Sequence, residues 1–203
     1  VYGGAGVPDE VGTVSRFLDF GFQINYLLRS RFIGNICRNG FSRRYVDCRE
    51  FLIEHHAILN SCEYLEKLGY DVTYLEVDGD GLISPEQVMD AIRPDTTLIS
   101  VMFANNEVGK IEPIYQIGKI AREKQILFHT DAVQAYAQIP LSVNYYPVDL
   151  LGASAHKFHG PKGVGFLYIR DGIDIPSFIH GGSQERGKRD GTENVAGIVG
   201  MAK

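Results

Sequence analysis

The sequence has few cysteines and no segment long enough to cross a membrane. Its three cysteines are an odd number and show no regular spacing. That pattern argues against a disulfide framework and for a reducing compartment. No apolar run approaches the length of a membrane span, and the chain does not open with a charged and then apolar signal peptide. We therefore expect a cytoplasmic protein that does not enter a membrane.

The chain also lacks the excess positive charge of a nucleic-acid-binding protein. Its formal net charge is -5, which makes it too acidic to favour a phosphate backbone. No spacing of histidines and cysteines predicts a zinc site, and no internal repeat or low-complexity stretch is present. The 203 residues are 44% hydrophobic, which is enough to form one sizeable core.

From residue 53 onward, predicted helices and strands alternate. Apolar periodicity and turn residues predict helices over 55–68, 85–92 and 113–124, and strands over 71–77, 97–103, 126–130, 149–153 and 164–169. Such alternation is typical of an α/β fold with a mostly parallel sheet flanked by helices. The last strand follows its predecessor closely, so we expect it to pair antiparallel.

The stretch around Lys157 is the most informative part of the chain. A predicted strand delivers Ser154, His156 and Lys157 to its end, and a glycine-rich turn follows at once. A lysine amine can form a Schiff base with the aldehyde of pyridoxal phosphate, while serine, histidine and backbone N–H groups hold the phosphate. The alternative is that Lys157 is an ordinary surface lysine.

A second group of polar residues follows the strand over 126–130. Ligands of open α/β sheets bind at the carboxyl ends of the strands, where Asp131 lies. An aspartate that faces a pyridine nitrogen keeps it protonated. Asp131 could instead cap a following helix. Gln134 could donate to the phenolate oxygen of the cofactor, or could simply lie on a surface.

Two further candidates come from other segments. Asn106 follows the strand over 97–103 and could reach the cofactor ring, although Asn and Gly also favour ordinary turns. His55 opens the helix over 55–68. A histidine there can lie flat over a planar ring and move protons near neutral pH, but more often caps a helix or lies on the surface.

Together these segments resemble one family, the cysteine desulfurases among the class V, aspartate-aminotransferase-like pyridoxal phosphate enzymes. Five motifs in the same order carry the resemblance: Ile53–Leu59, Ala104–Gly109, His129–Gln134, Ser154–Gly165 and Gly181–Asn194. The resemblance implies the large cofactor-binding domain of the aspartate-aminotransferase-like fold (fold type I) over residues 53–203. It also implies that this chain is incomplete and lacks the C-terminal small domain.

The resemblance assigns four residues to the cofactor ring. It implies that His55 stacks on the ring, that Asn106 and Gln134 contact its phenolate side, and that Asp131 pairs with the pyridine nitrogen. His55 could also act as an acid or base.

Four more residues are assigned to the aldehyde and phosphate ends of the cofactor. The resemblance implies that Lys157 forms the covalent link and that Ser154 and His156 bind the phosphate. Thr192 would reach the phosphate bound by the other subunit of a homodimer.

The implied activity is conversion of L-cysteine to L-alanine, with transfer of the sulfur to an enzyme cysteine as a persulfide. The sulfur would then pass to an acceptor or scaffold protein, for iron-sulfur cluster assembly or related sulfur metabolism. The family carries its persulfide cysteine on a mobile loop of the C-terminal domain, which this sequence does not reach. We therefore expect the chain alone to be incomplete for catalysis.

Two alternatives stay open. One is another class V enzyme such as a selenocysteine lyase, because the cofactor motifs do not determine the substrate. The other is a non-catalytic chain that folds partly, or that forms a heterodimer with a full-length relative.

Residues 1–52 form an anomalous N-terminal segment. The first fifty residues contain seven arginines and no lysine, whereas residues 51–203 contain five arginines and eight lysines. The resemblance stops near residue 11 and resumes at Ile53, and the phosphate-gripping loop that the family has in this interval is not found. We hypothesise a disrupted reading frame from about residue 11, with a divergent insertion as the alternative.

Resequencing of the coding DNA tests this hypothesis. We expect compensating frameshifts on both sides of codons 11–52. A continuous frame with no such shifts would leave the divergent insertion as the explanation.

Overall fold

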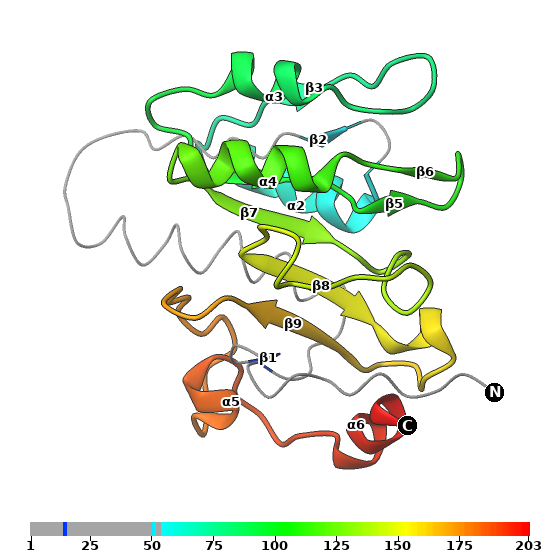
Figure 1. The fold of residues 1–203 in the computed structure, drawn as a ribbon. Coiled ribbons are helices and arrows are strands. Elements are labelled where there is room, and N and C mark those ends of the chain that lie inside the picture. The colour runs from blue at the N-terminus through cyan, green and yellow to red at the C-terminus, as the bar shows by residue number, and fades with distance from the viewer. Residues whose placement is uncertain (1–13, 16–49, 52–53) are drawn as a thin grey trace.

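The computed structural model describes residues 14–15, 50–51 and 54–203, and most of the anomalous segment 1–52 lies outside this range. Its main sheet has five strands in the order β1-β9-β8-β7-β4 (Figure 1). The parallel part consists of β4 (Leu98–Ser100), β7 (Leu127–Asp131) and β8 (Leu150–Ser154). Next to it lies β9 (Gly165–Ile169), which runs antiparallel to β8, and then β1 (Val14–Ser15), which is antiparallel to β9 and so runs in the direction of the parallel strands. The expected antiparallel pairing of the last predicted strand is therefore confirmed.

Helices cover both faces of this sheet. On one face, α3 (Pro85–Ala91) and α4 (Ile114–Glu123) contribute Val88, Ile114 and Ile117 to a core that also contains Phe128 from β7. On the other face, α2 (His56–Lys67) packs its apolar stripe against the sheet. The expected α/β class, with a mostly parallel sheet between helices, is confirmed.

The capping residues explain where two of these helices begin. Ser84 forms a capping box with Gln87, and Pro85 occupies the first turn of α3, where its missing N–H is not needed. The α2 helix begins after His55, whose side chain accepts a hydrogen bond from the backbone of Ala57. Both helices lie within one residue of their predicted starts and ends.

The strand predicted over 71–77 is much shorter in the structure. Only β3 (Tyr74–Leu75) is formed, in a two-stranded parallel pair with β2 (Glu50–Phe51). The strand predicted over 97–103 is assigned only over Leu98–Ser100. Its pairing nevertheless continues, because the N–H groups of Val101 and Phe103 donate to the β7 carbonyls of His129 and Asp131.

Smaller elements complete the described chain. A hairpin of β5 (Ala104–Asn105) and β6 (Lys110–Ile111) follows β4, and the 3-10 helix η1 (Ala155–Phe158) follows β8. The C-terminal part carries α5 (Gln184–Gly187) and α6 (Val195–Ala202), neither of which we predicted. Both lie beyond β9 and β1, on the far side of the sheet from α3 (Figure 1). Among the described residues, no helix has the length and apolarity required to cross a membrane.

Ala137 has a strained backbone in the loop after β7. Its φ is +62°, in the left-handed region that an L side chain enters at a cost of about 1 to 2 kcal/mol. Ala137→Gly should therefore raise the free energy of unfolding, by about 0.5 to 1 kcal/mol after the greater unfolded-state freedom of glycine is subtracted. Urea unfolding measures this difference.

Gly172 provides the matched control for this prediction. Its φ is +84°, and an added Cβ would meet no atom within 4 Å. Gly172→Ala should therefore destabilise the protein through the backbone alone. Equal stabilities of Ala137→Gly and the parent protein would contradict the interpretation.

Candidate functional site

A small cavity lies where the carboxyl ends of the parallel strands meet. Its volume is about 40 Å³. The walls come from the amino end of α2, the segment after β4, the end of β7 with its following loop, and the turn after β8. The lining residues are His55, Met102, Asp131, Val133, Gln134, His156 and Lys157. Segments that are far apart in the sequence thus contribute to one site, at the sheet edge predicted for ligands.

Asp131 is the most buried ionisable group of this cavity. Its side chain lies at the end of β7 and is 1% exposed. One carboxylate oxygen, Oδ1, accepts a hydrogen bond of 2.9 Å from the N–H of Val133. The other, Oδ2, is buried and has no hydrogen-bond partner among the described residues. Asp131 therefore bonds to the loop that follows it and retains one unused acceptor.

Burial controls the acidity of Asp131. Desolvation of the carboxylate raises its pKa from the usual 3.8 to about 7, against smaller opposite effects of the Val133 hydrogen bond and the positive charge of Lys157. A cation or a donor next to Oδ2 would favour the ionised form.

His55 both caps α2 and lines the cavity. Its Nδ1 accepts the Ala57 N–H at 3.1 Å, so the neutral ring carries its proton on Nε2. Partial burial lowers the pKa of His55, and the charges of His56 and Lys157 lower it further, while Glu107 opposes them. The helix cap and the ring in the cavity are thus compatible roles of one side chain.

Lys157 lies in η1, on the turn that connects β8 and β9. Its backbone carbonyl accepts a hydrogen bond of 3.3 Å from Gln138, in the loop after β7. The turn closes tightly, since a Cβ on Gly160 would come within 2.8 Å of the Ala155 Cβ. The lysine is exposed, so its amine is accessible from solvent.

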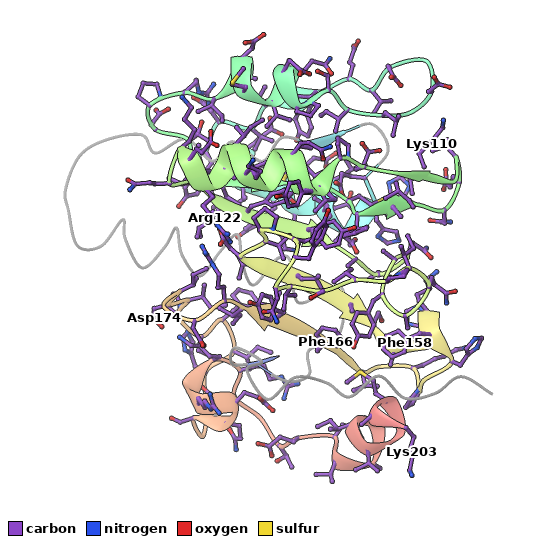
Figure 2. All side chains as sticks on the ribbon, viewed as in Figure 1. Lys110, Arg122, Phe158, Phe166, Asp174 and Lys203 are labelled. Atoms are coloured by element: carbon purple, nitrogen blue, oxygen red, sulfur yellow. The ribbon has the colours of Figure 1, made fainter. Side chains whose placement is uncertain are left out.

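Aromatic packing holds this turn against the sheet. The ring of Tyr136 packs edge-on against Phe158 and Phe166, with ring centroids 5.1 and 4.8 Å apart. Figure 2 labels these two phenylalanines, at the end of the sheet where the lysine turn lies. The turn after β8 is therefore tied to the loop after β7 by apolar contacts as well as by a hydrogen bond.

Some of the remaining predicted residues line the cavity and others do not. Gln134 and His156 line it, whereas Ser154 is buried, does not line it, and contacts His156, with 2.8 Å between its Oγ and Nδ1 of His156. Asn106 and Thr192 are exposed, and neither lines the cavity. Their predicted contacts with a cofactor stay predictions.

Sequence reasoning missed two of the lining residues and one neighbour of the site. Met102 lies in the apolar run of the strand predicted over 97–103, and Val133 lies within the motif that contains Asp131, so the sequence could have indicated both positions. Asn105 is buried, and its Oδ1 accepts hydrogen bonds from the N–H groups of Glu107 and Val108. Asn105 thus shapes the turn that exposes Asn106.

Comparison with known proteins identifies related sequences. A family model described as aminotransferase class V matches residues 49–203. A protein of Dictyoglomus turgidum named cysteine desulfurase IscS is 60% identical over 151 residues, which are 74% of this chain and 38% of that protein. A cysteine desulfurase IscS of Histophilus somni is 45% identical over 97% of this chain and 49% of its own length. The chain thus spans less than half of each of these relatives.

Solved structures of similar fold also superpose on most of this chain. A structure named NifS-like protein superposes with a TM-score of 0.84 at 42% identity, covering 93% of this chain and 51% of its own. A structure described as SspA in complex with cysteine has a TM-score of 0.83 at 40% identity, covering 92% of this chain and 53% of its own.

The raised pKa of Asp131 predicts a pH-dependent contribution to stability. The folded carboxyl binds its proton more tightly than the unfolded one, so its contribution is fully present below about pH 4 and is lost as the pH rises through about 7. Asp131→Asn cannot ionise. Without added cofactor, its stability relative to the parent protein should therefore rise across this range, by about 4 kcal/mol at most.

Urea unfolding at a series of pH values, with both proteins side by side, measures this difference. The contributions of other titrating groups cancel when the two profiles are subtracted. A difference that stays constant between about pH 4 and about pH 8 would contradict the assignment.

Proposed function

We propose that the cavity is the pyridoxal phosphate site of a cysteine desulfurase, because the chain belongs to the aminotransferase class V family. The observation that carries the proposal is the buried, unpartnered Oδ2 of Asp131 in the same cavity as Lys157. A carboxylate that needs a donor and an accessible amine are the two groups that a pyridine nitrogen and an aldehyde require. The relatives named cysteine desulfurase support the substrate class.

The residues present fit this cofactor. Asp131 would hold the ring nitrogen, Lys157 the aldehyde carbon, and His55 the face of the ring. Ser154 and His156 would hold the phosphate. The exposed side chains of His156 and Lys157 form the part of the cavity wall that faces solvent.

The chemistry of the chain's own groups follows from their protonation. Bound pyridoxal phosphate would supply an electron sink for bond changes at the substrate carbon next to the amine. The ionised carboxylate of Asp131 would keep a proton on the ring nitrogen. The Nζ of Lys157 would take a proton from the substrate carbon and return it. The neutral ring of His55 would hold a transferable proton on Nε2, as its lowered pKa favours.

The proposed activity of the whole protein is release of L-alanine from L-cysteine, with sulfur passing to an enzyme cysteine as a persulfide. Cys62, in α2, is fully buried and is a core residue. The persulfide would therefore form on a cysteine other than Cys62. A selenocysteine lyase would use the same cofactor groups.

We further propose a cytoplasmic homodimer that delivers sulfur to an acceptor or scaffold protein, for iron-sulfur cluster assembly or related sulfur metabolism. In this arrangement Thr192, exposed on the loop before α6, would contact the phosphate bound by the other subunit. Asn106 and Gln134 would contact the phenolate side of the ring.

Addition of pyridoxal phosphate to the purified chain tests the cofactor site. The parent protein should acquire a visible absorption band, and Lys157→Ala should lose it because the amine that bonds the aldehyde is gone. Lys162→Ala is the matched control, since Lys162 is exposed on the same turn but does not line the cavity.

The control variant should keep the band of the parent protein. Absence of a band in the parent protein would favour the non-catalytic alternative. Retention of the band in Lys157→Ala would mean that nonspecific lysine modification produces the signal.

A further inference from the structure

Glu54 is a buried acid directly next to the cavity. Its side chain is 5% exposed, although it lies one residue before the exposed His55. Its Oε1 accepts a hydrogen bond from the backbone N–H of Met102, 48 residues further along the chain. Burial of a carboxylate is costly unless strong hydrogen-bond donors surround it, and the N–H of Met102 supplies one such donor to Glu54.

The position of Met102 explains why its N–H needs this partner. The N–H groups of Val101 and Phe103 donate to β7, at 3.1 and 2.8 Å. Because successive N–H groups of a strand alternate in direction, that of Met102 faces the other way. On that side, β4 is the edge of the main sheet as far as the described residues show. Glu54 therefore accepts a hydrogen bond from an N–H that no described strand of the main sheet accepts.

The same bond joins two walls of the cavity. His55 follows Glu54 in the chain and is held by its own bond to Ala57, while Met102, in the segment after β4, lines the same cavity. We propose that Glu54 is a positioning residue, which sets the amino end of α2 against the end of β4 and so holds His55 at the depth needed to stack on a cofactor. This inference rests on the proposed pyridoxal phosphate site.

Glu112 makes the same kind of bond away from the cavity. It is 4% exposed, and its Oε2 accepts the backbone N–H of Ile83 at 3.0 Å across 29 residues. It is absent from the cavity lining. Removal of either carboxylate leaves one buried backbone N–H without its acceptor, so the two losses should destabilise the fold to a similar degree. Only the loss of Glu54 should alter the cavity.

The experiment compares Glu54→Ala, Glu54→Gln and Glu112→Ala with the parent protein. Urea unfolding measures stability, absorbance titration measures the Kd for pyridoxal phosphate, and NMR titration of the ring protons measures the pKa of His55 without cofactor. Stability should fall in both alanine variants. Glu54→Ala should raise the Kd about tenfold, and Glu112→Ala should leave it within about twofold.

The NMR titration distinguishes positioning from general loss of stability. In Glu54→Ala the pKa of His55 should move up toward 6.5, because the ring becomes more exposed, and in Glu112→Ala it should stay where the parent protein has it. Glu54→Gln retains an acceptor oxygen and should restore both the Kd and the pKa. Equal effects of Glu54→Ala and Glu112→Ala on both readouts would overturn the proposal.

The two proposals fail in different ways. If the parent protein does not bind pyridoxal phosphate, the proposed function fails, and the pKa of His55 in the cofactor-free protein still decides the role of Glu54. If the parent protein binds the cofactor and Glu54→Ala binds it equally well with an unchanged His55 pKa, only the positioning role is wrong.

Discussion

The buried carboxylate of Asp131 is the constraint on which the arrangement of the cavity depends. The Val133 N–H satisfies one of its oxygens, and desolvation raises its pKa to about 7. A group in this state is costly to ionise unless a positive or hydrogen-donating partner lies beside it. The surrounding elements bring such a partner into range, since the amine of Lys157 lowers the pKa of Asp131 from across the cavity.

The sheet provides the geometry for this meeting. Because β4, β7 and β8 run parallel, their carboxyl ends lie at one edge, and each is followed by a segment that lines the cavity. The turn after β8 is too short for a crossover to a parallel strand, so β9 returns antiparallel and holds η1 in place. The Glu54 bond and the His55 cap add the amino end of α2 to the same edge.

Local sequence signals were sufficient for most of the helices and strands that build this frame. The start of α3 follows from its capping residues and agrees with the prediction, whereas the start of α4 and the ends of β7, β8 and β9 follow from apolar patterns and differ from prediction by at most one residue. The predicted strand over 71–77 was wrong in length: within this range only Tyr74 and Leu75 form a strand, and they pair with the described residues of β2. The short α5 has Glu185 and Arg186 in left-handed backbone conformations, which no propensity favours.

The sequence by itself determined the α/β class, the family motifs and the chemical types of the candidate site residues. Local residue order specifies the hydrophobic period, the caps and the turns that produce them. The tertiary structure alone decided that Asp131 is buried with one unused oxygen and that Asn106 is exposed while Asn105 is buried. It also decided that Glu54 reaches Met102. These properties depend on which distant segments exclude water from a side chain, and no local pattern contains that information.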